Sequence, residues 1–189
     1  MNTLLLGFFM HLGLFIMGTQ GYSSQNIQTD HGPIHYIEAE GQGDLPPIVL
    51  IHGIGSQAID LYPVFNQLRP YTKKIIALDL PAHGLSNVPV EDMNYQEVQD
   101  SFYHAMDLLL SKEEPVLLFG NSLGGLEAIL YANYHPEELA GLILVSPAGA
   151  QMNQEQYQRL EHIFLVDATQ HPENLLPLLF NQAPSNPDM

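Results

Sequence analysis

A single serine stands among glycines in the segment Gly120-Asn121-Ser122-Leu123-Gly124, directly after an apolar run and directly before a helical pattern. In a strand–turn–helix context, the G-x-S-x-G form holds the serine hydroxyl on a sharp, strained turn above a sheet. Flanking glycines let the strand and the helix approach without a Cβ clash. The pattern therefore predicts that Ser122 is a nucleophile. The simpler alternative is a glycine-rich turn with an incidental serine.

Composition describes a globular chain of one domain. Its 189 residues are 46% hydrophobic and 14% charged, and the formal net charge is -16. The chain has only five Lys and Arg but 21 Asp and Glu, too few cations to form a basic patch. We therefore expect no nucleic-acid partner. The sequence contains no cysteine, which excludes disulfides, thiolate zinc sites and cysteine nucleophiles.

An apolar run occupies residues 4–18 and is followed by polar residues 19–25. The run is shorter than the ~20 residues of a membrane span, and its length suits the apolar part of a secretory signal. Small residues near Gly18 to Gly21 fit a cleavage site, although no Lys or Arg precedes the run. We expect residues 1–21 to be a signal peptide and the protein to be secreted or periplasmic. The alternatives are an N-terminal membrane anchor, with membrane association only through this segment, and a mis-assigned start.

The elements that must hold Ser122 alternate along the chain. An alternating strand pattern covers residues 32–41, and helical patterns cover residues 95–114 and the segment from Ser122 to near Pro136. Short continuous apolar runs, typical of strands buried on both faces, lie at residues 46–53, 73–84, 115–122 and 139–149. This order predicts an α/β fold, a mostly parallel sheet with helices on both faces. The strand ends then converge at one edge of the sheet, where ligands bind in such folds.

The chain resembles the α/β-hydrolase-fold serine hydrolases over residues 25–182. The resemblance rests on the segments HGIGS, ALDLPAHGLS, GNSLGG and LAGLILVSPAG, in that order. The segment HPEELAGLILVSPAGAQ and the helix-like residues after it are most similar to cap-bearing, monoacylglycerol-lipase-like members and to carbon–carbon-bond hydrolases. The resemblance implies that residues 22–150 form the N-terminal part of the core and that residues 151–189 begin a helical cap.

By this resemblance, Ser122 is the nucleophile, and the backbone N–H groups of Ile54 and Leu123 form the oxyanion hole. The motifs that support these groups contribute His52, Gly53, Asp79, His83, Gly120 and Gly124. Asp79 and His83 belong to a structural turn in which Ala82 stands where the family usually has glycine. A serine at the elbow disfavours the aspartate-nucleophile branches of the family.

Other polar residues suggest no further chemistry. We expect no cofactor, because no segment resembles a dinucleotide loop or a P-loop, and no metal, because the following histidines lack metal-ligand spacing. We interpret them as surface or satisfied core residues: His35, His104, His135, His162 and His171. Glu127 is interpreted as a packing or solvated residue. The apolar residues 175–180 fit a core, or an acyl pocket within a cap.

The partners that would activate Ser122 cannot be identified in the sequence. In this fold an acid and then a histidine follow the serine, yet Ser146 and its neighbours occupy the tip where some members place the acid. Asp167 and His171 lie in helix-like sequence. We therefore expect a C-terminally truncated serine hydrolase of carboxylic esters or related acyl substrates, with little activity alone. A non-catalytic protein that binds a small apolar ligand or a partner is the alternative; a peptidase or thioesterase would differ only in substrate.

Overall fold

The structure is a computed structural model, and it describes residues 3–89, 94–111 and 113–162. The chain forms two compact units, Met1–Gly149 and Ala150–Met189, each of which is described by itself. In the second unit the described helix is α5 (Gln154–His162). The helix expected at residues 172–182, together with Asp167 and His171, lies outside the described residues.

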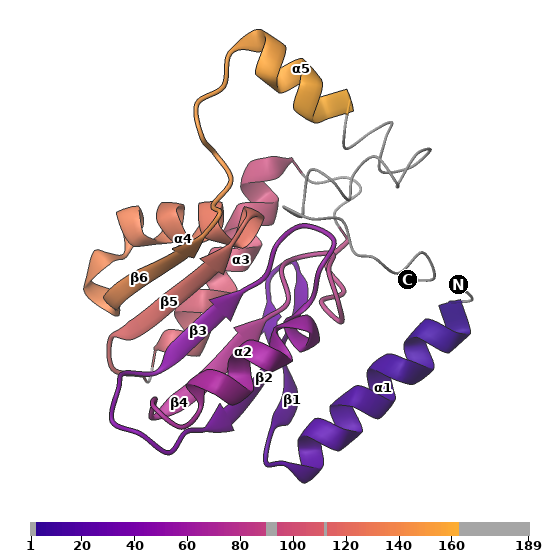
Figure 1. Cartoon of the computed structure of the whole chain (residues 1–189), viewed down its shortest axis with the longest axis vertical. Helices are drawn as coiled ribbons and strands as arrows, with labels where there is room; N and C mark the ends of the chain where they lie inside the picture. Colours follow the sequence, from indigo (N-terminus) through magenta and orange to yellow (C-terminus); the bar gives the residue numbers. More distant parts are fainter. Residues whose placement is uncertain (1–2, 90–93, 112, 163–189) are drawn as a thin grey trace, which may run out of the picture. The chain divides into compact units, whose positions relative to one another are not determined.

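A six-stranded sheet forms the centre of the first unit (Figure 1). The strands are β1 (Ser23–Thr29), β2 (Gly32–Glu40), β3 (Ile48–Ile51), β4 (Lys74–Leu78), β5 (Val116–Asn121) and β6 (Leu139–Val145). Their order is β1-β2-β4-β3-β5-β6. Strands β4, β3, β5 and β6 are parallel, whereas β1 and β2 are antiparallel to each other and β2 is antiparallel to β4. The mostly parallel sheet predicted from the sequence is confirmed.

Helices cover both faces of the sheet. They are α1 (Thr3–Thr19), α2 (Tyr62–Leu68), α3 (Tyr95–Leu110) and α4 (Leu123–Tyr134), with 3-10 turns η1 (Ala58–Leu61) and η2 (Pro136–Glu138). A capping box starts α3, because the Asn94 side chain accepts from the Glu97 N–H and the Glu97 carboxylate accepts from the Asn94 N–H. Pro136 follows α4 and lacks the N–H that would continue it.

The core has two halves because successive side chains of a strand point to opposite faces. Val49 and Ile51 of β3 pack in one cluster with residues of α3 and α4. Ile48 and Leu50 pack in the other cluster with residues of α1 and α2. All four side chains are at most 2% exposed. This arrangement explains why the β3 sequence is a continuous apolar run.

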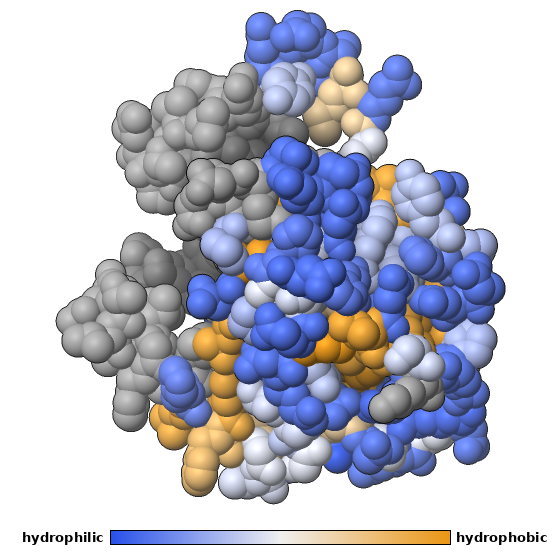
Figure 2. All heavy atoms as spheres, turned by 180° about the vertical axis from the view of Figure 1, so that it is seen from behind, coloured by the Kyte–Doolittle hydropathy of each residue, from blue (hydrophilic) through white to orange (hydrophobic). Residues whose placement is uncertain are grey.

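Two elements of the sheet differ from the sequence prediction. Strand β1 was not predicted, because its polar residues are mostly exposed and give no apolar alternation. Strand β6 has the apolar run of a strand buried on both faces, yet it is the edge strand. Its four large residues are each 38–41% exposed: Leu142, Ile143, Leu144 and Val145. Within the described sheet, β6 has a paired neighbour on one side only. The burial on both faces that its apolar run indicates is therefore not observed, whereas the exposed sheet edge that we expect for residues 141–146 of a truncated chain is. Seen from behind, hydrophilic residues cover most of the surface, and apolar patches lie between them (Figure 2).

Replacing Gly124 by alanine is expected to destabilise the fold severely. A Cβ at Gly124 would lie 2.4 Å from the carbonyl oxygen of His52 and 2.5 Å from that of Ile51, which are backbone atoms. Overpacking of this kind costs about 1–3 kcal/mol or more. Gly18→Ala is the matched control, since Gly18 lies in α1 with nothing within 4 Å of its Cβ position. The urea midpoint should fall for Gly124→Ala only; equal midpoints would contradict the close packing.

Candidate active site

Ser122 lies at the turn between β5 and α4, as the sequence predicts. β5 ends at Asn121 and α4 begins at Leu123. Ser122 itself has φ 50° and ψ −115°, a left-handed conformation that is strained for a residue with a side chain. Its carbonyl accepts hydrogen bonds from the N–H groups of Gly125 (3.0 Å) and Ala148 (2.8 Å). The turn is therefore held by both α4 and the segment after β6.

Close backbone contacts bring three strand ends together. A Cβ built at Gly53, after β3, would lie 3.1 Å from the Cβ of Ser122. A Cβ at Gly125 would lie 2.8 Å from the Cβ of Pro147, after β6. We call the set of loops at these strand ends the carboxyl-end rim, comprising residues 52–57, 79–86, 120–124 and 146–149. The rim is compact because glycines occupy its contact points.

The two N–H groups expected to form the oxyanion hole belong to this rim. Leu123 is the first residue of α4, so its N–H has no intrahelical acceptor. Among the described residues, neither the Leu123 N–H nor the Ile54 N–H donates a hydrogen bond. The Ile54 side chain is 63% exposed. That both N–H groups point into one space above Ser122 stays a prediction.

The buried carboxylate of Asp79 organises the loop after β4. Asp79 is 2% exposed and accepts hydrogen bonds from His35 Nδ1 (2.7 Å), from the Leu85 N–H (2.9 Å) and from the Ala58 N–H. Gly84 lies against it, because a Cβ there would come within 2.2 Å of Asp79 Oδ2. Asp79 thus links β2, η1 and its own loop, which agrees with the structural role inferred from the sequence. His35 is a satisfied core residue, as expected.

His52 is buried and braces the loop after β3. Its Nδ1 donates to the Gly53 carbonyl (2.7 Å), and its Nε2 accepts from the Leu80 N–H (3.0 Å). Because a backbone N–H can only donate, Nε2 must be unprotonated. Burial lowers the pKa of His52 below the ordinary value of 6.5, although the Gly53 carbonyl and the Asp79 carboxylate oppose the shift. His52 is therefore a neutral structural imidazole.

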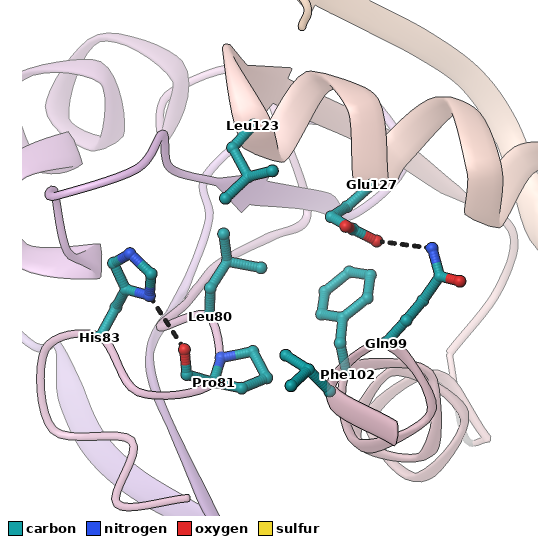
Figure 3. Close-up of a pocket in the computed structure, with 8 residues that line it drawn as sticks. Leu80, Pro81, His83, Gln99, Phe102, Leu123 and Glu127 are labelled. Carbon is teal, nitrogen blue, oxygen red and sulfur yellow. Dashed lines mark hydrogen bonds between the residues drawn. The ribbon is translucent and has the colours of Figure 1, made fainter. Parts of the chain in front are cut away.

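A mostly apolar cavity of about 160 Å³ lies beside the first turn of α4 (Figure 3). Its walls come from α3, α4 and the loop after β4: Leu80, Pro81, His83, Val98, Gln99, Phe102, Leu123 and Glu127. Glu127 is 5% exposed and accepts a hydrogen bond from Gln99 at 3.2 Å. Glu127 is therefore a packing residue rather than a solvated one. The cavity was not foreseen, because Val98, Gln99 and Phe102 carry only the periodicity of an ordinary core helix.

The described residues do not bring a base to the serine. In this part of the chain, the Ser122 hydroxyl makes no hydrogen bond to a histidine or a carboxylate. His83 instead contacts the Pro81 carbonyl through Nδ1 at 2.9 Å. The tip after β6 presents Ser146 in a left-handed conformation (φ 45°), followed by Pro147 and Ala148. Its side chains include no carboxylate that could orient a base.

Another cluster of polar side chains lies away from the rim. Asp107, His135 and Glu138 offer ligand atoms within 4.8 Å of one another. The Tyr131 hydroxyl lies within hydrogen-bond distance of both carboxylates, and burial, followed by Glu138, raises the pKa of that tyrosine. No sequence spacing indicated this cluster, because Asp107 comes from α3, whereas His135 follows α4 and Glu138 ends η2.

The parallel sheet, the covering helices and the sharp serine turn at the carboxyl-end rim define a protein of the hydrolase type. A family model for the alpha/beta hydrolase fold matches residues 46–185. The chain belongs to this α/β-hydrolase fold family, as its sequence motifs predict.

The alignments with known proteins of the family cover only part of the length of those proteins. A monoacylglycerol lipase of Rattus norvegicus is 28% identical over 149 residues, which cover 77% of this chain and 42% of that protein. A membrane phospholipase A described as a bacterial virulence factor has a TM-score of 0.72 and 28% identity, covering 97% of this chain and 59% of that one. Naproxen esterase of Bacillus subtilis, at 19% identity and a TM-score of 0.69, shows the fold alone. The chain spans about two fifths of the length of the curated monoacylglycerol lipases that it matches.

Replacing Ala82 by glycine is expected to stabilise the protein by about 1 kcal/mol. Ala82 is exposed and has φ 59°, a conformation that glycine adopts without strain. Ala132→Gly in α4 is the control, since the same change in a helix should destabilise by about 1 kcal/mol. Urea unfolding measures both. The same sign of change for the two variants would contradict the left-handed conformation at Ala82.

Stability should decrease on acidification because of His52. A base with a lowered pKa binds fewer protons in the folded than in the unfolded chain, so folding is disfavoured as the pH falls below 6.5. His52→Gln keeps an acceptor for the Leu80 N–H and removes this titration. The loss of unfolding free energy between pH 7.5 and pH 5.5 should therefore be smaller in the variant. An equal loss in both proteins would show that His52 does not titrate as described.

Proposed function

We propose that this chain carries the nucleophile of a serine hydrolase that acts on carboxylic esters or related acyl substrates. The observation that carries the proposal is the left-handed conformation of Ser122 between β5 and α4, in contact with the loop after β3. Backbone hydrogen bonds from Gly125 and Ala148 hold the turn in this strained conformation, and such strain is typical of residues kept for function. The names of the related lipase and phospholipase support the same reaction class.

In the proposed reaction, the Ser122 oxygen attacks the acyl carbon while a base takes the hydroxyl proton. The electron pair of the carbonyl bond moves to its oxygen, and the N–H groups of Leu123 and Ile54 donate to that oxyanion. Each such donor lowers the activation free energy by about 3–4 kcal/mol. The positive end of the α4 dipole, at Leu123, favours the same charge. Collapse of the intermediate breaks the bond to the alcohol oxygen, which takes the proton from the base, and leaves the acyl group on the Ser122 oxygen. Water, losing a proton to the same base, then attacks the acyl carbon and releases the acid, and the proton returns to Ser122.

The base and the acid that orients it are proposed to come from outside the described residues. His52 is held neutral by two hydrogen bonds and has no free nitrogen to offer Ser122. The cavity beside Leu123 is proposed to receive the acyl chain, because its walls are largely apolar. Leu123 connects the two sites, since its side chain lines the cavity and its N–H is the proposed donor to the oxyanion. An apolar acyl group fits a chain with net charge -16 better than an anionic substrate does.

A second candidate is a non-catalytic protein that binds a small apolar ligand. The observation in its favour is the same cavity, which exists beside a serine without a described base. Under this hypothesis, binding of a short-chain fatty acid would be unaffected by Ser122→Ala and no ester would be turned over by any form of the protein.

Turnover of p-nitrophenyl butyrate tests the proposal. The 189-residue chain is expected to hydrolyse it barely above background, because losing triad members leaves only the oxyanion hole and binding. A form extended by any sequence that its gene encodes after Met189 is expected to be active, and to lose at least 1,000-fold in kcat as Ser122→Ala, on the order of other serine hydrolases.

Two results would contradict this account. Activity of the extended form that survives Ser122→Ala would remove Ser122 from the role of nucleophile. Robust turnover by the 189-residue chain that disappears with Ser122→Ala would place the base inside this chain, with His83 as the first residue to replace.

A further inference from the structure

The C-terminal end of α1 is built into the folded unit. Met17 and Tyr22 are only 3% and 6% exposed and belong to the same core cluster as Phe65. The Tyr22 hydroxyl donates to Asn66 Oδ1 at 2.8 Å, and the guanidinium carbon of Arg69 lies 4.7 Å from the centre of the Tyr22 ring. The end of the apolar run is therefore a packed part of the core rather than a free leader.

The segment between these two residues is held as well. Arg69 Nη1 donates to the Gln20 carbonyl at 2.7 Å, and the Tyr62 hydroxyl donates to the Gln20 side chain. Cleavage near Gly18 to Gly21 would separate Met17 from the cluster to which Tyr22 belongs. These contacts favour a chain that keeps α1 over one from which α1 is removed.

The contacts also fix the direction in which α1 runs along the sheet. Its end lies at Arg69, which donates to the carbonyl of Glu40 (2.9 Å) beside the start of β4. Further back, a Cβ at Gly13 would lie 2.8 Å from the Ile59 side chain. Ile59 belongs to η1, which is bonded to Asp79 at the far end of β4. The helix thus lies between the amino end of the parallel strands, near residue 19, and the carboxyl-end rim, near residue 13.

Residues 3–12 continue α1 beyond that point. Ten helical residues extend about 15 Å, so α1 passes the carboxyl-end rim on which Ser122 lies. The helix is continuous from Thr3 to Thr19 (Figure 1). Residues 3–19 include no Asp, Glu, Lys or Arg. The N-terminal part of α1, which contains no Asp, Glu, Lys or Arg, therefore extends past the end of the sheet at which the candidate active site lies.

The outward face of the described part of α1 is apolar. Leu12, Phe15 and Ile16, spaced to share one helix face, are 40%, 71% and 47% exposed. From behind, apolar residues form a column along the edge on which α1 lies (Figure 2). A helix that is apolar all round is stable in a core or in lipid rather than in water. One face of α1 packs on the protein, and the exposed Leu12, Phe15 and Ile16 lie between the exposed polar residues His11 and Thr19. Exposed apolar side chains of this size fit lipid.

Within the described residues, no helix combines the length and the apolar character that a membrane crossing requires. At 17 residues α1 is about 25 Å long, shorter than the ~30 Å hydrocarbon core of a bilayer. With five Lys plus Arg against 21 Asp plus Glu, the chain has no means of attracting anionic headgroups. The surface that suits α1 is thus one leaflet of a zwitterionic membrane, entered through apolar contact.

We propose that α1 is a retained part of the fold that inserts its N-terminal half into one leaflet of a lipid bilayer and so turns the carboxyl-end rim toward the membrane. An acyl substrate dissolved in the bilayer would then meet Ser122 from the lipid side. The binding itself requires no hydrolysis, so its test is separate from that of the proposed function.

Flotation of the 189-residue chain with phosphatidylcholine vesicles tests the insertion. The chain is expected to float with the vesicles at low and at high salt, and to bind less to phosphatidylglycerol vesicles. Leu5→Ser combined with Phe9→Ser, in the half of α1 that is proposed to insert, should reduce the bound fraction at least tenfold. Leu142→Ser combined with Val145→Ser is the control, because it replaces two exposed apolar residues of β6 in the same way. The control should bind as the parent does.

Single tryptophans test the orientation, since the chain has none of its own. Ile54 at the rim and Tyr71 near the amino ends of the strands are 63% and 62% exposed, so they form a matched pair. Ile54→Trp should be quenched by vesicles of brominated phosphatidylcholine, and Tyr71→Trp should not. Circular dichroism and urea midpoints establish that each variant is folded before it is compared.

Three outcomes would overturn the proposal. Flotation that is lost with the β6 pair but kept with the α1 pair would place lipid binding on the sheet edge. Equal or reversed quenching of the two tryptophans would exclude the orientation. The parent chain could instead fail to bind vesicles and sediment as a dimer that the two α1 substitutions convert into a monomer. In that case the partner of α1 would be a second copy of the chain.

Discussion

The candidate site depends on the close backbone contact between α4 and the ends of β3 and β5. At Gly124 the helix meets the carbonyls of Ile51 and His52, and at Gly120 the strand meets the backbone of Gly124 and Gly125. No side chain fits at either point. Because the helix is this near, Ser122 has to turn sharply between strand and helix, and it takes up a conformation that a free serine avoids. The geometry of the turn at Ser122 is thus a consequence of backbone packing.

A buried carboxylate gives the rim its second constraint. Asp79 receives hydrogen bonds from β2, η1 and its own loop, so one side chain fixes three segments that are far apart in the sequence. Burying a carboxylate is costly unless it is well hydrogen-bonded, and here it accepts both backbone N–H groups and an imidazole. His52, held between Gly53 and Leu80, ties the loop after β3 to the same place. Rigid supports of this kind suit a site that must present two N–H groups in fixed positions.

The sequence predicted those parts of the fold whose signals are local. Continuous apolar runs identified β3, β4 and β5, and the glycines around Ser122 identified the elbow. Strand β1 was not predicted, because an edge strand with exposed polar residues has no apolar alternation in its sequence. The exposure of β6 depends on what pairs with it, which its own residues do not encode. The cavity beside Leu123 arises where α3, α4 and a loop meet, so no single segment carries its signal. The directions of the oxyanion N–H groups remain a prediction.

The order of the strands has a consequence for how the protein is made. From β3 onward on one side, the sheet is extended by β5 and then β6, the same order in which they occur in the chain. During synthesis each of these strands can therefore pair with a partner that has already left the ribosome, and no strand has to be inserted between two that are already paired. Domains generally acquire structure from the N-terminal side as they are synthesised. On that side of β3 the sheet can accordingly assemble vectorially, each new strand protecting the backbone edge left open by the previous one.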